Sequence, residues 1–341
     1  MDIGEVGSSQ QLRLPPGAAA GSNSRDSREI DRVDVNAPLY SIETAALTAK
    51  SGSGEAISGL NLRIPRKSVV GLLGREGAGK STLLRVLVNL SRPVSGTATV
   101  SGVPCRRLKP AHFTRIGYVP QEAKIPGWMK AGAFLRYCRG FYPDWDDAFC
   151  ESLAKAFRIK PDRRIGSASP GFRAKLSLIA SLAYRPSVLL LDDPFRHVEP
   201  RERDAMIRGI MELIDLDDWC IVIAARETDE VERMADWVGL LHRGRLELSE
   251  STASLQRRFR QVEAFVMEPK QPAGGFPETW LRPRFEGQCL RFLDTRFDAK
   301  ETPAQVRALM GEACSVESHT LSFRKIFDEL DKTYEVTSRS S

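Results

Sequence analysis

Short apolar runs alternate with helical patterns through the centre of the chain. The helical pattern that follows the first run begins at Lys80, where leucines recur on one face. Buried strands that alternate with helices are typical of a mostly parallel sheet. The pattern predicts an α/β domain over about residues 38–250. Its expected strands are SVVGLLG (68–74), TATVSG (97–102), RIGYVPQ (115–121), SVLLLDDP (187–194) and CIVIAA (220–225).

A stretch without a clear strand separates the third and fourth of these runs. It contains the periodic segments AGAFLRYC and DDAFCESLAKAF, which predict an inserted helical subdomain over about residues 122–185. Lys and Arg outnumber Asp and Glu by more than two to one over residues 104–175. Two interpretations stay open: a solvated helical surface, or a face that meets an acidic partner or lipid headgroups.

The two ends of the chain have different patterns. Residues 1–37 are rich in Gly, Ser, Ala and Asp, so we expect a disordered tail. Residues 251–341 predict a small α+β accessory or regulatory domain, in which VEAFVM and QCLRFLD are strands. A helix starts at Thr302 and Pro303 and ends near Gly311, and a last amphipathic helix carries Phe323, Ile326, Phe327 and Leu330 on one side.

Composition narrows the class of protein. The 341 residues are enough for about two domains, and 42% of them are apolar, so most of the chain is expected to fold. The net charge of +6 does not imply a nucleic-acid partner. There is no apolar run of about 18 residues and no signal pattern, so we expect neither a membrane span nor secretion. The six scattered cysteines predict reduced thiols in a cytosolic protein.

The segment GREGAGKST is the most specific functional motif in the sequence. It fits the pattern GxxxxGK[ST], with an apolar strand before it and a helix after it. Glycines let the backbone turn its N–H groups around a polyphosphate, Lys80 reaches the outer phosphates, and Ser81 offers a hydroxyl to Mg²⁺. The alternative is a glycine turn that caps a helix. The predicted ATP-binding residues are Gly74, Arg75, Glu76, Gly77, Ala78, Gly79, Lys80, Ser81 and Thr82.

A second site element ends the strand that precedes Pro194. Asp192 and Asp193 follow an apolar run, as in a Walker B strand, where the first carboxylate holds the metal and the second orients the attacking water. Two acids at a strand end are otherwise a solvated turn. The phosphate loop needs such a partner, which favours the functional interpretation.

Taken together, these segments resemble the ATP-binding subunit of an ABC transporter over about residues 38–250. The stretch LAYRPSVLLLDDP matches best, while FYPDWDD and SFRKIFDEL are similar to single-domain bacterial subunits that serve a separately encoded exporter permease. The resemblance implies a P-loop NTPase fold, an ABC ATPase core with an inserted helical subdomain. It also implies ATP and Mg²⁺ as cofactors, a homodimer or heterodimer around two ATP molecules, a membrane permease as partner, and a cytoplasmic location, peripheral on the inner face of the cell membrane through that permease.

Further site residues follow from the resemblance. Gln121 matches the glutamine that contacts Mg²⁺ and senses the permease, although alone it is an ordinary polar loop residue. Ser169 and Gly171 match the signature loop, which contacts the terminal phosphate of the opposite subunit. Ser169 is equally a good helix N-cap, so a well-capped helix is the alternative.

The departures from the family pattern lie at the nucleotide. The signature LSGGQ is replaced by ASPGF, in which Pro170 lacks a backbone N–H. Asp193 stands where the family carries the longer Glu, and Arg226 stands at the switch histidine. Ser51 aligns near the adenine-stacking aromatic, and Glu76 adds a negative charge to the phosphate loop. We therefore predict firm ATP binding and slow hydrolysis, with Asp193 and Arg226 as the catalytic residues. Two interpretations of Arg226 stay open: the function of the switch histidine is lost, or Arg226 replaces it as a catalytic group.

Two other functions stay open. One is an ATP-binding regulatory subunit that hydrolyses little and pairs with a more complete ATPase. The other is a non-transport P-loop protein; the lack of an NKxD guanine-reading motif and of a long coiled-coil insertion argues against it.

Overall fold

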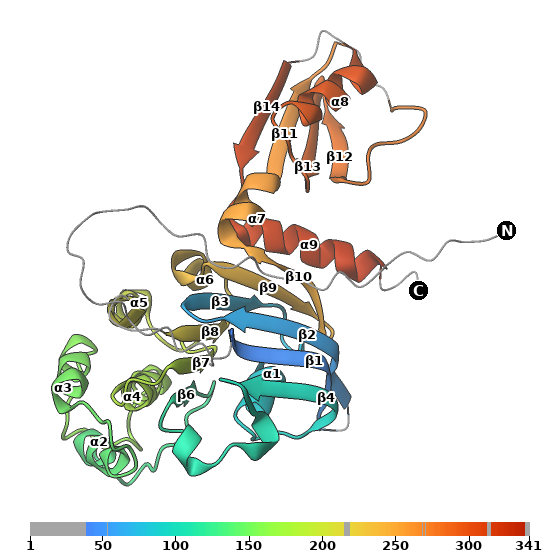
Figure 1. Ribbon diagram of the computed structural model, residues 1–341. Coiled ribbons are helices and arrows are strands. Elements are labelled where there is room, and N and C mark those ends of the chain that lie inside the picture. The colour runs from blue at the N-terminus through green and yellow to red at the C-terminus, as the bar shows by residue number, and fades with distance from the viewer. Residues whose placement is uncertain are drawn as a thin grey trace, which may run out of the picture. The chain divides into compact units, whose positions relative to one another are not determined.

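The computed structural model describes residues 39–52, 54–214, 219–267, 269, 271–311 and 315–337 (Figure 1). The tail expected at residues 1–37 lies outside the described residues. The described chain divides into two compact units. The first contains the residues up to 226 together with 239–249, and the second contains 227–238 and the residues from 250 onward.

A six-stranded sheet of order β10-β9-β3-β8-β7-β6 forms the centre of the first unit. Strands β3 (Ser68–Leu73), β8 (Cys220–Ala224), β7 (Val188–Asp192) and β6 (Ile116–Val119) are parallel neighbours. Every residue of β3, β7 and β8 is buried, which explains their unbroken apolar runs. Strands β9 (Trp237–His242) and β10 (Arg245–Ser251) extend the sheet beyond β3. The predicted α/β class is confirmed.

A second sheet, of order β2-β1-β4-β5, corrects one strand assignment. The run TATVSG lies mostly in β4 (Pro93–Val100), which pairs antiparallel with β1 (Tyr40–Ser51) and does not join the parallel sheet. Ala98 and Val100 are buried while Thr97 is exposed, the one-sided alternation of an antiparallel strand. The sheet is completed by β2 (Gly54–Pro65), which pairs antiparallel with β1, and β5 (Val103–Pro104).

Helices connect the parallel strands. Helix α1 (Lys80–Leu87) follows β3, and α5 (Pro200–Ile214) precedes β8. Between β6 and β7 lie α2 (Ala131–Arg139), α3 (Asp147–Ala156) and α4 (Pro170–Leu182), drawn in green to yellow-green in Figure 1. Residues 120–187, all of which the structure describes, contain no strand. The inserted helical region is therefore confirmed.

The second unit is α+β. Its antiparallel sheet has the order β12-β13-β11-β14, formed by Trp280–Glu286, Cys289–Asp294, Arg260–Phe265 and Ser315–Thr320. Trp280 stacks on Phe292 with ring centroids 3.9 Å apart, in a core that Val306 and Met310 of α8 (Glu301–Met310) complete. Helix α8 ends before Gly311, whose φ is 99°, as the sequence predicts. The remaining helices are α6 (Asp229–Met234), α7 (Thr252–Arg258) and α9 (Phe323–Thr337).

No helix in the described ranges combines the length and apolar character that crossing a membrane requires. Cys105, Cys138, Cys150, Cys220 and Cys289 are free thiols, as predicted for them, and Cys314 lies outside the described residues.

Candidate functional site

The loop between β3 and α1 requires its glycines. Gly74, Gly77 and Gly79 have φ values of 149°, 80° and 105°, in the region that favours glycine. A Cβ on Gly79 would lie 2.3 Å from the carbonyl oxygen of Ala56, and one on Gly74 would lie 2.3 Å from that of Leu241. The loop is therefore pressed between backbone carbonyls of β2 and β9, which only glycine permits at these two positions.

The turn between β9 and β10 holds this loop from outside. The N–H of Gly244 donates to the carbonyl of Ala78 at 3.1 Å, and the carbonyl of Gly244 accepts from the N–H of Ser58 at 3.0 Å. One turn thus bonds both the phosphate loop and β2.

Lys80, the first residue of α1, lies below the loop. Its side chain is buried, and Nζ donates to the carbonyls of Gly74 and Arg75, the latter at 3.0 Å. Burial lowers the pKa of Lys80 to about 8, and the negative charge of Asp193 only partly opposes that effect. The ammonium is therefore held at the loop and binds its proton more weakly than an ordinary lysine does.

Ser81 and Asp192 form an oxygen-rich corner beside Lys80. Ser81 Oγ donates to Asp192 Oδ1 at 2.8 Å, while Asp192 Oδ2 is buried and has no hydrogen-bond partner within the described chain. Burial also raises the pKa of Asp192. Carboxylate and hydroxyl oxygens are the ligands that Mg²⁺ prefers. A buried carboxylate oxygen without a hydrogen-bond partner is costly, and a bound metal ion would compensate that cost. These residues fit a magnesium ion.

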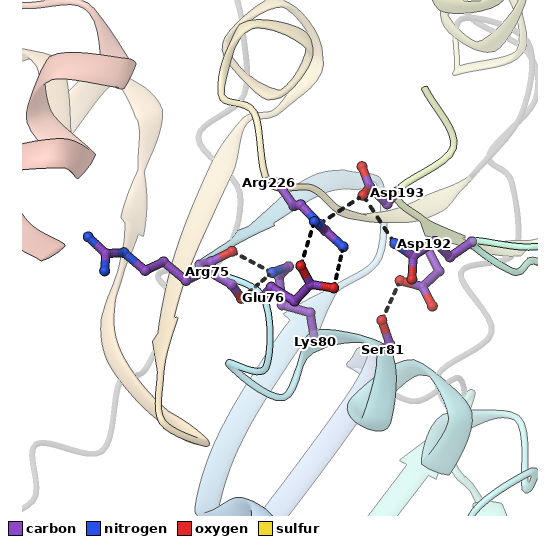
Figure 2. A network of polar contacts seen from close by, with 9 residues as sticks. Arg75, Glu76, Lys80, Ser81, Asp192, Asp193 and Arg226 are labelled. Atoms are coloured by element: carbon purple, nitrogen blue, oxygen red, sulfur yellow. Dashed lines mark hydrogen bonds and ion pairs between the residues drawn. The ribbon is translucent and has the colours of Figure 1, made fainter. Parts of the chain in front are cut away.

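Arg226 joins two acids at the edge of this site (Figure 2). Its Nη1 and Nη2 each lie 2.9 Å from a carboxylate oxygen of Glu76, and its Nε lies 3.3 Å from Asp193 Oδ2. The Asp193 backbone is in the left-handed region at φ 51°, and its N–H donates to the carbonyl of Ala224 at 2.8 Å. Three departures that the sequence showed separately are thus one contact network.

Gln121 follows β6 and lies against the same network. Its Nε2 is 3.5 Å from Asp193 Oδ2. With the amide rotated by half a turn, its oxygen accepts from Arg226 Nη2 at 3.1 Å and from Arg196 Nη1 at 2.5 Å. In both orientations Gln121 reaches the residues expected to act on the terminal phosphate.

A pocket of about 240 Å³ collects these side chains. Arg85 is a lining residue that sequence reasoning missed, although its position four residues after Ser81 places it on the same helix face. Ala56 was also missed, and it comes from a distant strand that no local pattern connects to the loop. The lining residues are Ser51, Ala56, Glu76, Gly77, Ala78, Gly79, Lys80, Ser81, Thr82, Arg85, Gln121, Asp192, Asp193 and Arg226.

Ser169 and Gly171 are not among the lining residues. Ser169 caps α4, since its Oγ accepts from the N–H of Phe172 at 3.2 Å. A Cβ on Gly171 would lie 2.6 Å from the carbonyl oxygen of His197. Phe172 is buried, with the guanidinium of Arg163 5.4 Å from its ring centroid. Within one chain these residues shape the start of α4, and their role toward a second subunit stays a prediction.

Comparison with known proteins finds similarity to ATP-binding proteins of ABC transporters. A family model described as "ABC transporter" matches residues 57–196. The ribose import ATP-binding protein RbsA of Pseudomonas putida is 30% identical over 251 residues, covering 68% of this chain. The chain spans about half (49%) of RbsA's length. The daunorubicin/doxorubicin resistance ATP-binding protein DrrA of Streptomyces peucetius is 29% identical over 226 residues, covering 64% of this chain and 68% of DrrA.

A solved structure shares the fold. It is a dimeric post-hydrolysis state of the ATP-binding cassette MJ0796 bound to ADP and Pi, with a TM-score of 0.56 and 18% identity. The similarity covers 62% of this chain and 98% of the cassette.

Proposed function

Because this chain contains an ATP-binding domain of the ABC transporter family, we propose that it binds ATP in a dimer and drives a separate membrane permease. The observation that carries the proposal is the corner formed by Lys80, Ser81 and Asp192. It combines a buried cation with a hydroxyl and an unpartnered carboxylate oxygen beside the glycine loop.

The residues divide into three roles under this proposal. Backbone N–H groups of residues 74–82 and the ammonium of Lys80 bind the phosphates. Ser81, Gln121 and Asp192 hold Mg²⁺, which neutralises phosphate charge when bound. Asp193 positions the attacking water, and Arg226 stabilises charge on the terminal phosphate.

Slow hydrolysis is supported by the contact between Asp193 and Arg226. The Asp193 oxygen that would position water is paired with the guanidinium, and Asp193 is one methylene shorter than Glu. The same contact favours a second candidate, a regulatory subunit that binds ATP, hydrolyses little and pairs with a more complete ATPase. Steady-state turnover of the purified chain separates the two: measurable hydrolysis supports the first, and tight binding without hydrolysis supports the second.

We infer that Ser169 and Gly171 act across a dimer, toward ATP on the opposite subunit. The N-terminus of α4, a helix of 13 residues, favours anions, and the MJ0796 cassette is itself dimeric. Sedimentation with and without a non-hydrolysable ATP analogue tests this, because ATP is expected to promote the dimer. A mixed partner would appear as a heterodimer when the chain is purified from its own cells.

Residues 122–168 of the inserted helical region are the proposed docking site of the permease. They expose three aromatic side chains, Trp128, Tyr137 and Phe141, with exposed fractions of 76%, 57% and 62%. Tyr137 and Phe141 contact each other edge to face, with ring centroids 5.0 Å apart, and aromatic residues are enriched at protein interfaces. Trp128→Ala is therefore expected to weaken capture of the permease without changing ATP affinity, whereas Leu90→Ala, at an exposed leucine after α1, is the matched control.

Export is the proposed direction. The two relatives differ, since DrrA is named for drug resistance and RbsA for import. Export is supported by DrrA together with the segments FYPDWDD and SFRKIFDEL, which are similar to exporter subunits. We place the chain in the cytoplasm, peripheral on the inner face of the cell membrane through the permease, with no nucleic-acid partner. Residues 38–250 act as the nucleotide-binding domain and residues 251–341 as an accessory or regulatory domain.

Titration with ATP tests the core of the proposal. Lys80→Ala removes the cation that faces the phosphates, so ATP binding is expected to fall by about a hundredfold or more. Lys155→Ala, at an exposed position on α3, is the control for loss of one positive charge. Equal affinity in Lys80→Ala and the parent would exclude the assignment of the loop.

A further inference from the structure

Glu76 is the one acid within the phosphate loop, and its carboxylate has a specific partner. Both of its oxygens accept from Arg226 at 2.9 Å, and the side chain lines the pocket. The third donor of Arg226 in this network, Nε, faces Asp193. All three nitrogens of the guanidinium thus contact a carboxylate, two of them that of Glu76 and one that of Asp193.

The two carboxylates hold Arg226 unequally. The Asp193 side chain is only 14% exposed, and its backbone is bonded to the end of β8. The Glu76 side chain is 76% exposed. Exposed ion pairs are weak because water competes for both groups, so Glu76 is the partner that a stronger anion displaces. A terminal phosphate is such an anion, since it carries more charge and accepts two parallel bonds from arginine.

We propose that Glu76 is a specificity-determining residue that limits how strongly the site prefers ATP over ADP, because it lowers the affinity for ATP alone. It competes with the terminal phosphate for Arg226, and a nucleotide that carries this phosphate displaces it. The inference rests on the proposed function, under which the terminal phosphate faces Asp193 and therefore the guanidinium that contacts Asp193. ADP lacks the displacing group, so Arg226 stays paired with Glu76 when ADP binds.

The test measures nucleotide affinity by calorimetry, using a non-hydrolysable ATP analogue and ADP. Glu76→Gln keeps the size of the side chain and removes its charge. The analogue is expected to bind about fivefold more tightly to this variant, whereas ADP affinity changes less than twofold. In an Arg226→Gln background, Glu76→Gln is expected to change neither affinity. Glu151→Gln, an exposed acid on α3, is the control.

Simple repulsion between Glu76 and phosphate gives a different result. If Glu76 only repelled phosphate, Glu76→Gln would raise the affinity for both nucleotides alike, and the gain would persist in the Arg226→Gln background. That outcome overturns the proposal, as does an unchanged affinity for the analogue. A parent protein that binds neither nucleotide would remove the proposed function itself, and the inference with it.

Discussion

Arg226 Nε lies 3.3 Å from Asp193 Oδ2, so the carboxylate that follows Asp192 is paired with a cation. The pairing joins the ends of two adjacent parallel strands, β7 and β8. It gives a structural reason for the slow hydrolysis proposed above, because the oxygen that would orient water is paired with the guanidinium.

Asp193→Glu is expected to raise the rate of ATP hydrolysis by about tenfold or more. The additional methylene carries the carboxylate farther from the strand end, and displacements near 1 Å change rates by about a hundredfold. Steady-state phosphate release measures the effect. Asp193→Asn, which has no carboxylate, is expected to have no turnover. If the Glu variant is no faster than the parent, the short side chain paired with Arg226 is the working arrangement.

ATP binding is expected to take up protons increasingly as the pH rises from 7 to 9. The pKa of Lys80 is lowered to about 8, so the side chain loses its proton through this range, while a bound polyphosphate favours the charged form. ATP affinity therefore falls above pH 8. Calorimetry in buffers of different ionisation enthalpy measures the uptake. Lys80→Arg, which stays charged, serves as the comparison, and a flat profile in the parent would contradict the assignment.

Gly79→Ala and Gly77→Ala are a matched pair in one loop. Both have positive φ, but only at Gly79 would a Cβ meet a backbone oxygen, at 2.3 Å, while a Cβ at Gly77 has nothing within 4 Å. We expect Gly79→Ala to lower the free energy of unfolding by about 3 kcal/mol or more and Gly77→Ala by about 1 kcal/mol. Urea denaturation measures both. Equal losses would mean that backbone strain alone decides the effect.

Asp192→Asn is expected to change the stability of the fold in opposite directions with and without metal. Burial raises the pKa of Asp192, so its charged form at neutral pH costs stability that the amide does not. In the presence of EDTA the variant is expected to be more stable by about 1 kcal/mol, because the Ser81 hydroxyl still finds an acceptor. With Mg²⁺ and ATP the variant loses the stabilisation that the parent gains.

Thermal unfolding under the two conditions checks this reversal. Asp162→Asn is the control, since the Asp162 side chain is 94% exposed and pairs only at the surface with Lys130. A variant that is less stable than the parent in EDTA would show that Asp192 is satisfied without a metal.

The parts of the site that follow from sequence are the local ones. The loop around Lys80 and the acids after β7 are read directly, because a buried strand followed by glycines or carboxylates is a local pattern. The pairing of Glu76 with Arg226, 150 residues apart, is different. This pairing requires β3 and β8 to be neighbours in the sheet, with Leu72 opposite Ala224. The local pattern of each strand does not predict the order of the strands.

The antiparallel sheet of order β2-β1-β4-β5 shows the same limit in the fold. Register shifts interrupt the pairing of β1 with both β2 and β4, so β1 has no regular alternation along its length. In β2 only the second half, residues 60–64, alternates between buried and exposed positions. The β4 run was assigned to the wrong sheet because six residues do not distinguish a parallel strand from an antiparallel one. The contact of Ala56 with the phosphate loop was therefore invisible as well.

The turn at Gly244 has a mechanical consequence. Its N–H is bonded to Ala78 in the phosphate loop, and the strand that leaves it, β10, runs to Ser251, where the chain has already passed into the second unit. Tension applied to the chain beyond residue 249 therefore acts along a single strand whose other end is fastened to the loop around Lys80. The path from residue 250 to the phosphate loop therefore consists of one strand, β10, and one hydrogen bond, from the N–H of Gly244 to the carbonyl of Ala78.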